Sequence, residues 1–163
     1  MTKFLPKNEG VDHINVYSKS QLEIGRQLTN FAHTPFTCLD GGFESIEGYW
    51  YYLATGSIEP RFKCLFGFKA KEEGKKLLAS LGNNEDNNIK NSPEFIGKIK
   101  AALWFKILQN IDVAVALRQS TLPLTHYYWY GKNIDNPDNI VYLPQYQWII
   151  DELELIRRKL QYN

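Results

Sequence analysis

Three residues of this sequence are candidates for moving a proton or attacking a carbon atom: Glu47, Lys106 and His126. A carboxylate can serve as a general acid or base, and aromatic neighbours that desolvate it raise its pKa toward neutrality. A lysine of lowered pKa can attack a sugar carbonyl and form a Schiff base. A histidine titrates near neutral pH. The three residue types therefore suit acid–base or covalent chemistry.

Each of these residues also has a purely structural interpretation. Glu47 follows Ser45 at the start of an expected helix, where an acid complements the helix macrodipole. Lys106 interrupts the apolar run "ALWFKIL", and it either extends its charge to the surface or is buried with a lowered pKa. His126 lies within "LTHYYWYG", where a histidine can be a hydrogen-bonded packing residue. Spacing alone decides none of the three cases.

No metal or phosphate-loop motif accompanies these residues. Cys38 and Cys64 are far apart in the sequence, and His13 and His33 have no partners at metal-ligand spacing. The chain lacks a phosphate-binding glycine-rich motif, a GxSxG elbow and a metalloprotease signature. We therefore expect two reduced thiols, no metal and no cofactor.

Composition fits one globular domain with an unusual share of rings. The 163 residues are 44% hydrophobic, 23% charged and 14% aromatic, and Tyr and Trp offer flat faces with a polar tip. A net charge of +1 gives no strong field that would draw the protein onto nucleic acid. The N-terminus lacks an apolar signal core, and no stretch approaches membrane-spanning length. These features predict a soluble, cytoplasmic protein.

Hydrophobic spacing and capping residues indicate the elements that hold the candidate residues. Helices are expected from Ser45, as N-cap, to a stop at Gly56, and over 69–81, 92–110, 112–118 and 145–160. Strands are expected at 14–17, 34–40 and 122–131, and a surface loop at 82–91. The pattern predicts an α+β fold, a compact, mostly helical single domain with a small sheet. Residues 1–12 are expected to be an N-terminal extension, and residues 13–163 the domain.

Several segments, taken in order, resemble motifs of the NADAR family, also called YbiA-like. "LTNFAHTPF" (28–36) is close to the family's SNFxPxPF, and "FESIEGYW" (43–50) places Glu47 on its Ser-x-Glu. "LWFKILQN" (103–110) is close to KFxQN, and "HYYWYG" (126–131) is a weaker match to Asp-x-x-Trp-Gly. The matches extend from Ile14 to the C-terminus. The opening "VYSKSQLEIGRQLTNFA" is similar to phage-borne members in particular.

The resemblance implies a domain with an ADP-ribose-binding cleft and the activity of an ADP-ribosyl glycohydrolase. Its substrate would be a modified nucleobase, guanine favoured, in DNA or RNA, and a phage protein would use it in the host cytoplasm, as a monomer, against DNA ADP-ribosylation. The resemblance implies catalytic roles for Glu47, Lys106 and His126. The implied ligand-binding residues are Arg26, Asn30, Phe31, Trp50, Gln109, Asn110, Tyr128 and Trp129.

The sequence departs from the family pattern near its last motif. His126 stands where the family has an aspartate, and Tyr130 separates Trp129 from Gly131. The second acidic group is then Asp40, Asp135 or Asp138, or is replaced by His126, or is absent. Absence would leave a non-enzymatic module that binds ADP-ribose or a nucleotide signal. A further alternative is an N-glycosidase for a small phosphoribosylamino metabolite.

Overall fold

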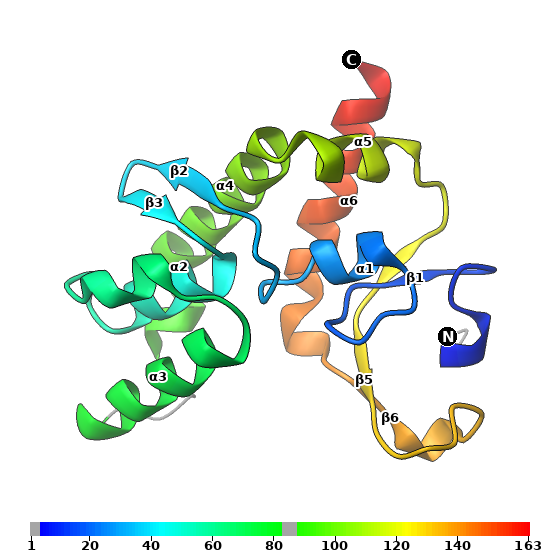
Figure 1. Cartoon of the computed structure of the whole chain (residues 1–163), viewed down its shortest axis with the longest axis horizontal. Helices are drawn as coiled ribbons and strands as arrows, with labels where there is room; N and C mark the ends of the chain where they lie inside the picture. Colours follow the sequence, from blue (N-terminus) through cyan, green and yellow to red (C-terminus); the bar gives the residue numbers. More distant parts are fainter. Residues whose placement is uncertain (1–3, 83–87) are drawn as a thin grey trace. The chain divides into compact units, whose positions relative to one another are not determined.

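The computed structural model describes residues 4–82 and 88–163 (Figure 1). Helices make up 56% of the chain and strands 12%, which confirms the predicted α+β class with mostly helical content. Within the domain, the residues group into two compact units. Unit 1 comprises Met1–Thr29 and Asp112–Asn163, and unit 2 comprises Asn30–Ile111.

Unit 2 consists of a hairpin followed by helices. Strands β2 (Phe36–Cys38) and β3 (Gly41–Phe43) pair antiparallel, with Phe36 opposite Phe43. The helices are α2 (Ile46–Ala54), α3 (Gly67–Ser80) and α4 (Pro93–Gln109), with the 3-10 helices η2 (Pro60–Cys64) and η3 (Asn88–Asn91) between them. The surface loop expected at 82–91 thus contains η3, and its residues 83–87 lie outside the described residues.

Serine side chains begin two of these helices, as predicted. Ser45 accepts a hydrogen bond from the backbone N–H of Gly48 at 2.9 Å, and Ser92 accepts one from Phe95 at 3.2 Å. Both serines have extended backbones and supply a partner for an N–H group that the helix itself leaves unsatisfied. Gly56, the predicted stop, follows α2 with a φ of +98°, a conformation that favours glycine. Side-chain capping therefore sets where α2 and α4 begin.

The core of unit 2 lies between the hairpin and its three α-helices. Its buried hydrophobic residues include Phe36, Phe43, Ile46, Tyr49, Trp50, Phe62, Ile99, Leu103 and Ile107. Gly74 lets α3 approach α2 closely, because a Cβ there would lie only 2.1 Å from the ring of Tyr51. Leu78 of α3 is buried, whereas Leu81, which follows the end of the helix, is exposed. Close packing of α3 on α2 thus depends on one glycine.

Unit 1 combines two small sheets with helices from both ends of the sequence. Strand β1 (Ile14–Asn15) pairs in parallel with β4 (Leu124–Thr125), and β5 (Tyr127–Trp129) pairs antiparallel with β6 (Ile140–Tyr142). The α-helices are α1 (Glu23–Gln27), α5 (Ile111–Gln119) and α6 (Gln147–Tyr162), and the 3-10 helices are η1 (Pro6–Asn8), η4 (Pro137–Asn139) and η5 (Pro144–Tyr146). The two predicted C-terminal helices are thereby confirmed.

The strand predicted over 122–131 is interrupted at His126. Residues on its two sides pair with different strands, β4 with β1 and β5 with β6. The amide of Asn15 holds the junction, because its Nδ2 donates to the carbonyl of Tyr127 at 3.0 Å and its Oδ1 accepts from the N–H of Tyr127 at 3.1 Å. A buried side chain thus replaces the ladder where the strand breaks.

The segment expected as an N-terminal extension takes part in unit 1. Glu9 is buried, and its carboxylate accepts from the backbone N–H groups of Asn15 and Gln21, each at 3.0 Å, and from the hydroxyl of Ser20. Residues after position 3 therefore help to hold β1 and the turn that follows it. Across residues 4–82 and 88–163, no helix combines the length and the apolar character needed to cross a bilayer.

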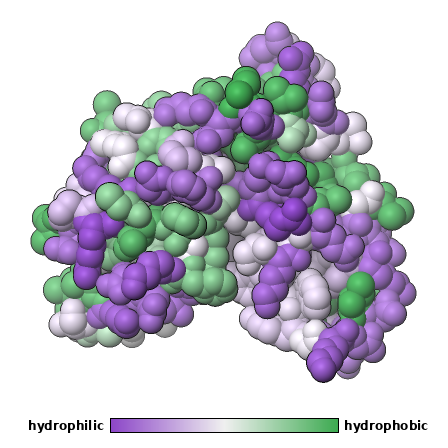
Figure 2. Space-filling model, in the orientation of Figure 1, coloured by the Kyte–Doolittle hydropathy of each residue, from purple (hydrophilic) through white to green (hydrophobic). Residues whose placement is uncertain are grey.

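Hydrophobic residues also reach the surface among hydrophilic ones, as Figure 2 shows for one face. In unit 2, two phenylalanines on either side of Gly67 are exposed: Phe66 by 47% and Phe68 by 69%. Large exposed rings in a polar surrounding often mark a binding surface.

Candidate functional site

Glu47 is the second residue of α2 and is nearly buried, with 8% of its surface exposed. Its backbone N–H donates to the carbonyl oxygen of Asn30 at 2.8 Å. The next residue, Gly48, lies against η2, where a Cβ would be only 2.4 Å from the carbonyl oxygen of Phe62. The first turn of α2 is therefore fixed by two other segments. It holds a carboxylate at the positive end of the helix macrodipole, where little water reaches it.

Asn30 and Phe31 pass between the beginnings of α2 and α3. The carbonyl of Asn30 accepts from Glu47, and the carbonyl of Phe31 accepts from the N–H of Gly67 at 3.0 Å. The ring of Phe31 meets the ring of Phe68 edge-on, with centroids 5.0 Å apart. Both predicted ligand-binding side chains are half-buried. Main-chain bonds thus place them directly beside the Glu47 turn.

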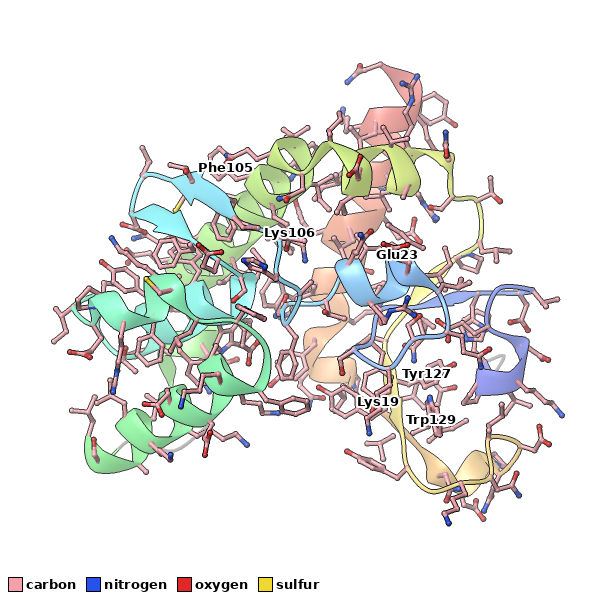
Figure 3. All side chains as sticks on the ribbon, viewed as in Figure 1. Lys19, Glu23, Phe105, Lys106, Tyr127 and Trp129 are labelled. Carbon is pink, nitrogen blue, oxygen red and sulfur yellow. The ribbon has the colours of Figure 1, made fainter. Side chains whose placement is uncertain are left out.

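Lys106 is fully buried in α4 (Figure 3). Burial disfavours the charged ammonium and lowers the pKa of Lys106 from 10.5 to about 7. Of the two arrangements that the sequence left open, the structure has the buried one. At neutral pH about half of such side chains are neutral amines, which are the nucleophilic form.

Gln109 and Asn110 hold β2 against the end of α4. The amide of Gln109 accepts from the N–H of Thr37 at 2.7 Å and donates to the carbonyl of Thr37 at 2.9 Å. The amide of Asn110 donates to the carbonyls of Pro35 and Lys106, at 2.9 and 2.8 Å. These predicted ligand-binding residues therefore connect the segment after Phe31 to the helix that carries Lys106. Their amides act on the protein's own backbone.

A cluster that sequence patterns did not indicate connects the hairpin to α2 and α4. The carboxylate of Asp40 accepts from the hydroxyl of Tyr49 at 2.6 Å and from the ammonium of Lys98 at 3.3 Å. Lys63 donates to the carbonyl of Asp40 at 2.8 Å. The hydrogen bond from Tyr49 and the two lysines lower the pKa of Asp40. Asp40 is therefore ionised at neutral pH and serves as an anchor of the hairpin.

Helices α2 and α4 pack against each other, and Leu53, near the end of α2, lines the same cavity as Glu94, near the start of α4. The ring of Trp50 meets Phe95, near the start of α4, with centroids 4.8 Å apart and planes at 90°. Tyr49 precedes Trp50 in α2, and Lys98 lies about one turn after Phe95 in α4. Both Tyr49 and Lys98 donate to the carboxylate of Asp40. The first turn of α2 and the later turns of α4 therefore lie at the same end of the pair. That end carries Glu47 and Lys106, whereas Trp50 is a core residue.

His126 belongs to unit 1, where its ring is half-buried. Its Nδ1 lies 2.7 Å from the carbonyl oxygen of Val16. A carbonyl can only accept, so Nδ1 carries the proton and the lone pair is on Nε2. Burial lowers the pKa of His126, and the bond to Val16 opposes this effect to a smaller extent. His126 is therefore a neutral imidazole at pH 7, which suits a base.

The remaining predicted ligand-binding residues also lie in unit 1. Tyr128 has its ring between Tyr17 and His126, with centroid distances of 5.1 and 5.2 Å. Trp129 ends β5 opposite Ile140 and is half-buried (Figure 3). Arg26 is exposed on α1, and its guanidinium donates to the carbonyl of Ser20 at 2.7 Å. The rings of Tyr17, Tyr128 and His126 therefore form a cluster within unit 1.

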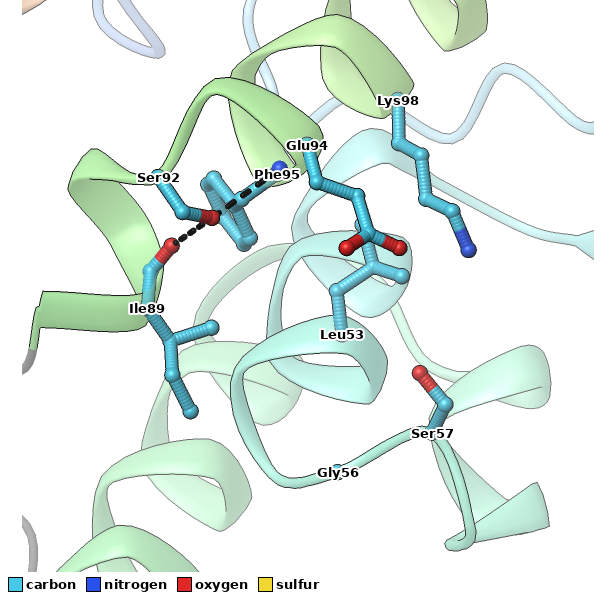
Figure 4. A pocket seen from close by; sticks show the side chains of 8 residues that line it. All are labelled: Leu53, Gly56, Ser57, Ile89, Ser92, Glu94, Phe95 and Lys98. Atoms are coloured by element: carbon cyan, nitrogen blue, oxygen red, sulfur yellow. Dashed lines mark hydrogen bonds between the residues drawn. The ribbon is translucent and has the colours of Figure 1, made fainter.

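A cavity of about 200 Å³ in unit 2 is lined by none of the eleven predicted site residues (Figure 4). It is lined by Leu53, Gly56, Ser57, Ile89, Ser92, Glu94, Phe95 and Lys98. Its volume is below the roughly 300–1,000 Å³ of ordinary small-molecule pockets. The carboxylate of Glu94 would also repel a diphosphate. This cavity is therefore unsuited to ADP-ribose.

In the parts of the chain that the structure describes, no three histidine, cysteine, aspartate or glutamate side chains gather in a way that could hold a metal ion. Of the three alternative acids, Asp40 lies in unit 2. Asp135 and Asp138 are exposed in unit 1, where Asp135 pairs with Lys7 at 3.4 Å.

The structure thus brings seven of the eleven predicted residues into unit 2: Asn30, Phe31, Glu47, Trp50, Lys106, Gln109 and Asn110. The other four, Arg26, His126, Tyr128 and Trp129, are in unit 1.

No protein-family model, curated protein or solved structure matches this chain.

Proposed function

We propose that this protein is an ADP-ribosyl glycohydrolase that removes ADP-ribose from a modified nucleobase, guanine in particular, in DNA or RNA. The observation that carries the proposal is the junction, within unit 2, of the three segments that resemble NADAR motifs. Asn30 of the first segment bonds to Glu47 of the second, and Thr37, just after the first, bonds to Gln109 of the third. Residues far apart in the sequence are thereby joined within the unit that holds both Glu47 and Lys106.

A carboxylate in the position of Glu47 suits cleavage of the bond between ribose C1 and the base nitrogen. The transition state has oxocarbenium character, which a nearby negative charge stabilises. The bond between C1 and the base nitrogen would break with its electron pair remaining on the nitrogen, and the oxygen of water would bond to C1 as the base departs. Glu47 would take a proton from that water and later return it to solvent, and the base nitrogen would take up a proton from solvent. Free ADP-ribose and the unmodified base are the products.

Lys106 suits a second route to the same products. When ribose is attached through an exocyclic amine, the sugar ring can open to an imine. The neutral amine of Lys106 adds to that C1, and the base leaves as a free amine. Water then adds to the lysine imine, which releases ADP-ribose and restores the amine. This route requires an amine-linked base, and the amino group of guanine provides one. The pKa of about 7 supports this role.

The proposal includes a biological setting. A phage protein of this kind would act as a monomer in the host cytoplasm, without a cofactor, and would reverse a host defence that ADP-ribosylates viral DNA. The similarity of "VYSKSQLEIGRQLTNFA" to phage-borne NADAR members supports this setting.

The test is to incubate the protein with DNA and RNA oligonucleotides ADP-ribosylated on guanine or on thymine, and to measure free ADP-ribose by chromatography. Release from the guanine substrates is expected. A phosphoribosylamino compound in the same panel tests the metabolite alternative. Release from that compound alone would replace the proposed substrate.

A non-enzymatic ADP-ribose-binding module is a second candidate, and one observation favours it. The position of the family's aspartate is occupied by His126, whose Nδ1 is engaged by Val16. Calorimetry with ADP-ribose distinguishes the two candidates. Binding without release from any substrate would favour the module.

A further inference from the structure

Four aromatic side chains near the start of α3 form a surface of which only Phe31 belongs to the predicted ADP-ribose-binding residues. They are Phe31, His33, Phe66 and Phe68, here called the aromatic platform. Phe66 and Phe68 are exposed by 47% and 69%, and the side chain of His33 by 53%. Several exposed aromatic side chains that lie together, unlike a single one, often mark a binding surface.

The rings of the platform are arranged in two pairs. The ring of His33 stacks on Phe66, with centroids 4.5 Å apart and planes at 19°. Phe31 meets Phe68 edge-on, at 5.0 Å and 76°. Gly67 lies between the two exposed phenylalanines with a φ of +60°, a backbone conformation that side-chain-bearing residues rarely adopt. The N–H of Gly67 donates to the carbonyl of Phe31 at 3.0 Å, so one hydrogen bond joins the two pairs.

Cations lie beside these rings. The ammonium of Lys71 is 5.7 Å from the centroid of the Phe31 ring. Lys69 is 64% exposed and pairs with Glu73 at 3.5 Å. A single acid, Glu44, contacts the platform directly, through a hydrogen bond with His33 among the described residues. Ring faces for bases together with ammonium groups for phosphates are the features of surfaces that bind single strands.

The platform continues directly into the Glu47 turn. Phe31 follows Asn30, whose carbonyl accepts the N–H of Glu47 at 2.8 Å. A nucleotide on the platform would therefore lie next to a base whose ribose is attacked at Glu47. A small metabolite has no flanking nucleotides and would leave the platform uncovered.

We infer that the aromatic platform binds the single-stranded nucleic acid on which the modified base is carried, by stacking the flanking bases and contacting their phosphates. This inference rests on the proposed function, which supplies the modified base that the strand carries. The substrate is then a polymer, and the aromatic platform contributes to the affinity for the strand and not to cleavage of the bond.

The experiment measures binding and turnover separately. Fluorescence anisotropy with labelled, unmodified 12-nucleotide DNA and RNA strands of one sequence reports binding without any chemistry. The double variant Phe66→Ala/Phe68→Ala is expected to bind the preferred strand about tenfold more weakly or worse, since each stacked base is worth roughly fivefold or more. With ADP-ribosylated strands, the double variant should have a higher KM and an unchanged kcat. Its release of ADP-ribose from an ADP-ribosylated mononucleotide should equal that of the wild type.

Phe105→Ala is the matched control, because Phe105 is also an exposed phenylalanine of unit 2, on α4 (37% exposed; Figure 3). It should bind strands as the wild type does. If the double variant melts at a lower temperature, Phe68→Ala alone removes the more exposed ring and gives the same comparison.

Failure of this inference differs from failure of the proposed function. Unchanged strand binding in the platform variants overturns the platform, whatever the enzyme activity. Loss of self-association in the double variant, with strand binding intact, would overturn it in favour of a protein interface. Ring-dependent strand binding without release of ADP-ribose from any substrate would support the platform and overturn the proposed activity.

Discussion

The backbone N–H of Glu47 donates to the carbonyl oxygen of Asn30 at 2.8 Å, across 17 positions of sequence. This bond joins the segment that resembles SNFxPxPF to the segment that resembles Ser-x-Glu. The position of the Glu47 carboxylate therefore depends on how α2 begins, and on the small space that Gly48 leaves beside η2.

Gly48→Ala should disturb that turn. The added Cβ would lie 2.4 Å from the carbonyl oxygen of Phe62 and 2.8 Å from that of Leu65, so backbone must shift. We expect a loss of about 1–3 kcal/mol in unfolding free energy and a lower kcat. Gly97→Ala is the control, since nothing lies within 4 Å of its Cβ and alanine favours a helix by up to about 1 kcal/mol. Equal effects of the two changes in urea titrations would contradict this account of Gly48.

Glu47→Gln should abolish ADP-ribose release and retain ADP-ribose binding, because the amide keeps the shape of the side chain and loses the base. Glu94→Gln is the matched control. Glu94 also lies in the first turn of a helix, and it is exposed. Calorimetry and a release assay on both variants make the comparison. Activity of Glu47→Gln near the wild-type rate would exclude Glu47 from the reaction.

Lys106 should form a covalent adduct with guanine-linked substrate if the imine route operates. Borohydride added during turnover reduces an imine to a stable amine, and peptide mass spectrometry then locates ADP-ribose on Lys106. Lys106→Met should give no adduct. Turnover without an adduct in the wild type would leave the route through Glu47 and water.

The buried amine also predicts how stability depends on pH. Between pH 7 and 10.5 the unfolded chain holds a proton on Lys106 that the folded protein has released, so the free energy of unfolding rises with pH in this window. Lys106→Met lacks this titration. The free energy of unfolding of the wild type should therefore rise relative to that of the variant, by on the order of a few kcal/mol, as the pH rises from 7 to 10.

Urea titrations at several pH values measure that difference. Lys76→Met, at a lysine that is 64% exposed, is the control and should give a difference that does not vary with pH. Parallel curves for Lys106→Met and the wild type would contradict a lowered pKa.

Gln109→Ala removes both hydrogen bonds to Thr37. We expect a loss of about 1–2 kcal/mol in unfolding free energy, since each net hydrogen bond contributes roughly 0.5–1.5 kcal/mol. Weaker binding of ADP-ribose should accompany it, because β2 is held to α4 through this amide. Gln119→Ala, at an exposed glutamine that ends α5, is the control for loss of the side chain alone. Calorimetric melting of both variants tests the assignment.

Local signals predicted the helices well. Ser45 and Ser92 cap their helices through hydrogen bonds within four residues, so the sequence near each serine contains the whole interaction. The burial of Lys106 was left open, because the residues around it are apolar on every side and do not show which face meets the core. The aromatic platform had a local signal, two phenylalanines around Gly67, whose exposure only the fold reveals.

Long-range contacts could not be predicted in this way. Gln109 and Thr37 are 72 positions apart, and nothing near either residue indicates the other. The prediction of one continuous strand over 122–131 was wrong at His126, because a long-range contact interrupts the strand there. The amide of Asn15, 112 positions from Tyr127, holds the backbone where the ladder stops. Sequence patterns therefore predicted the pieces of the candidate site better than their connections.

The most direct measurement of the central claim is the intact mass of a guanine-ADP-ribosylated single strand after incubation with the protein. The account predicts that the strand returns to its unmodified mass while free ADP-ribose accumulates, and that Glu47→Gln leaves the modified mass unchanged. A modified mass that persists with wild-type protein in molar excess, under conditions where calorimetry shows ADP-ribose bound, would contradict the proposed hydrolase.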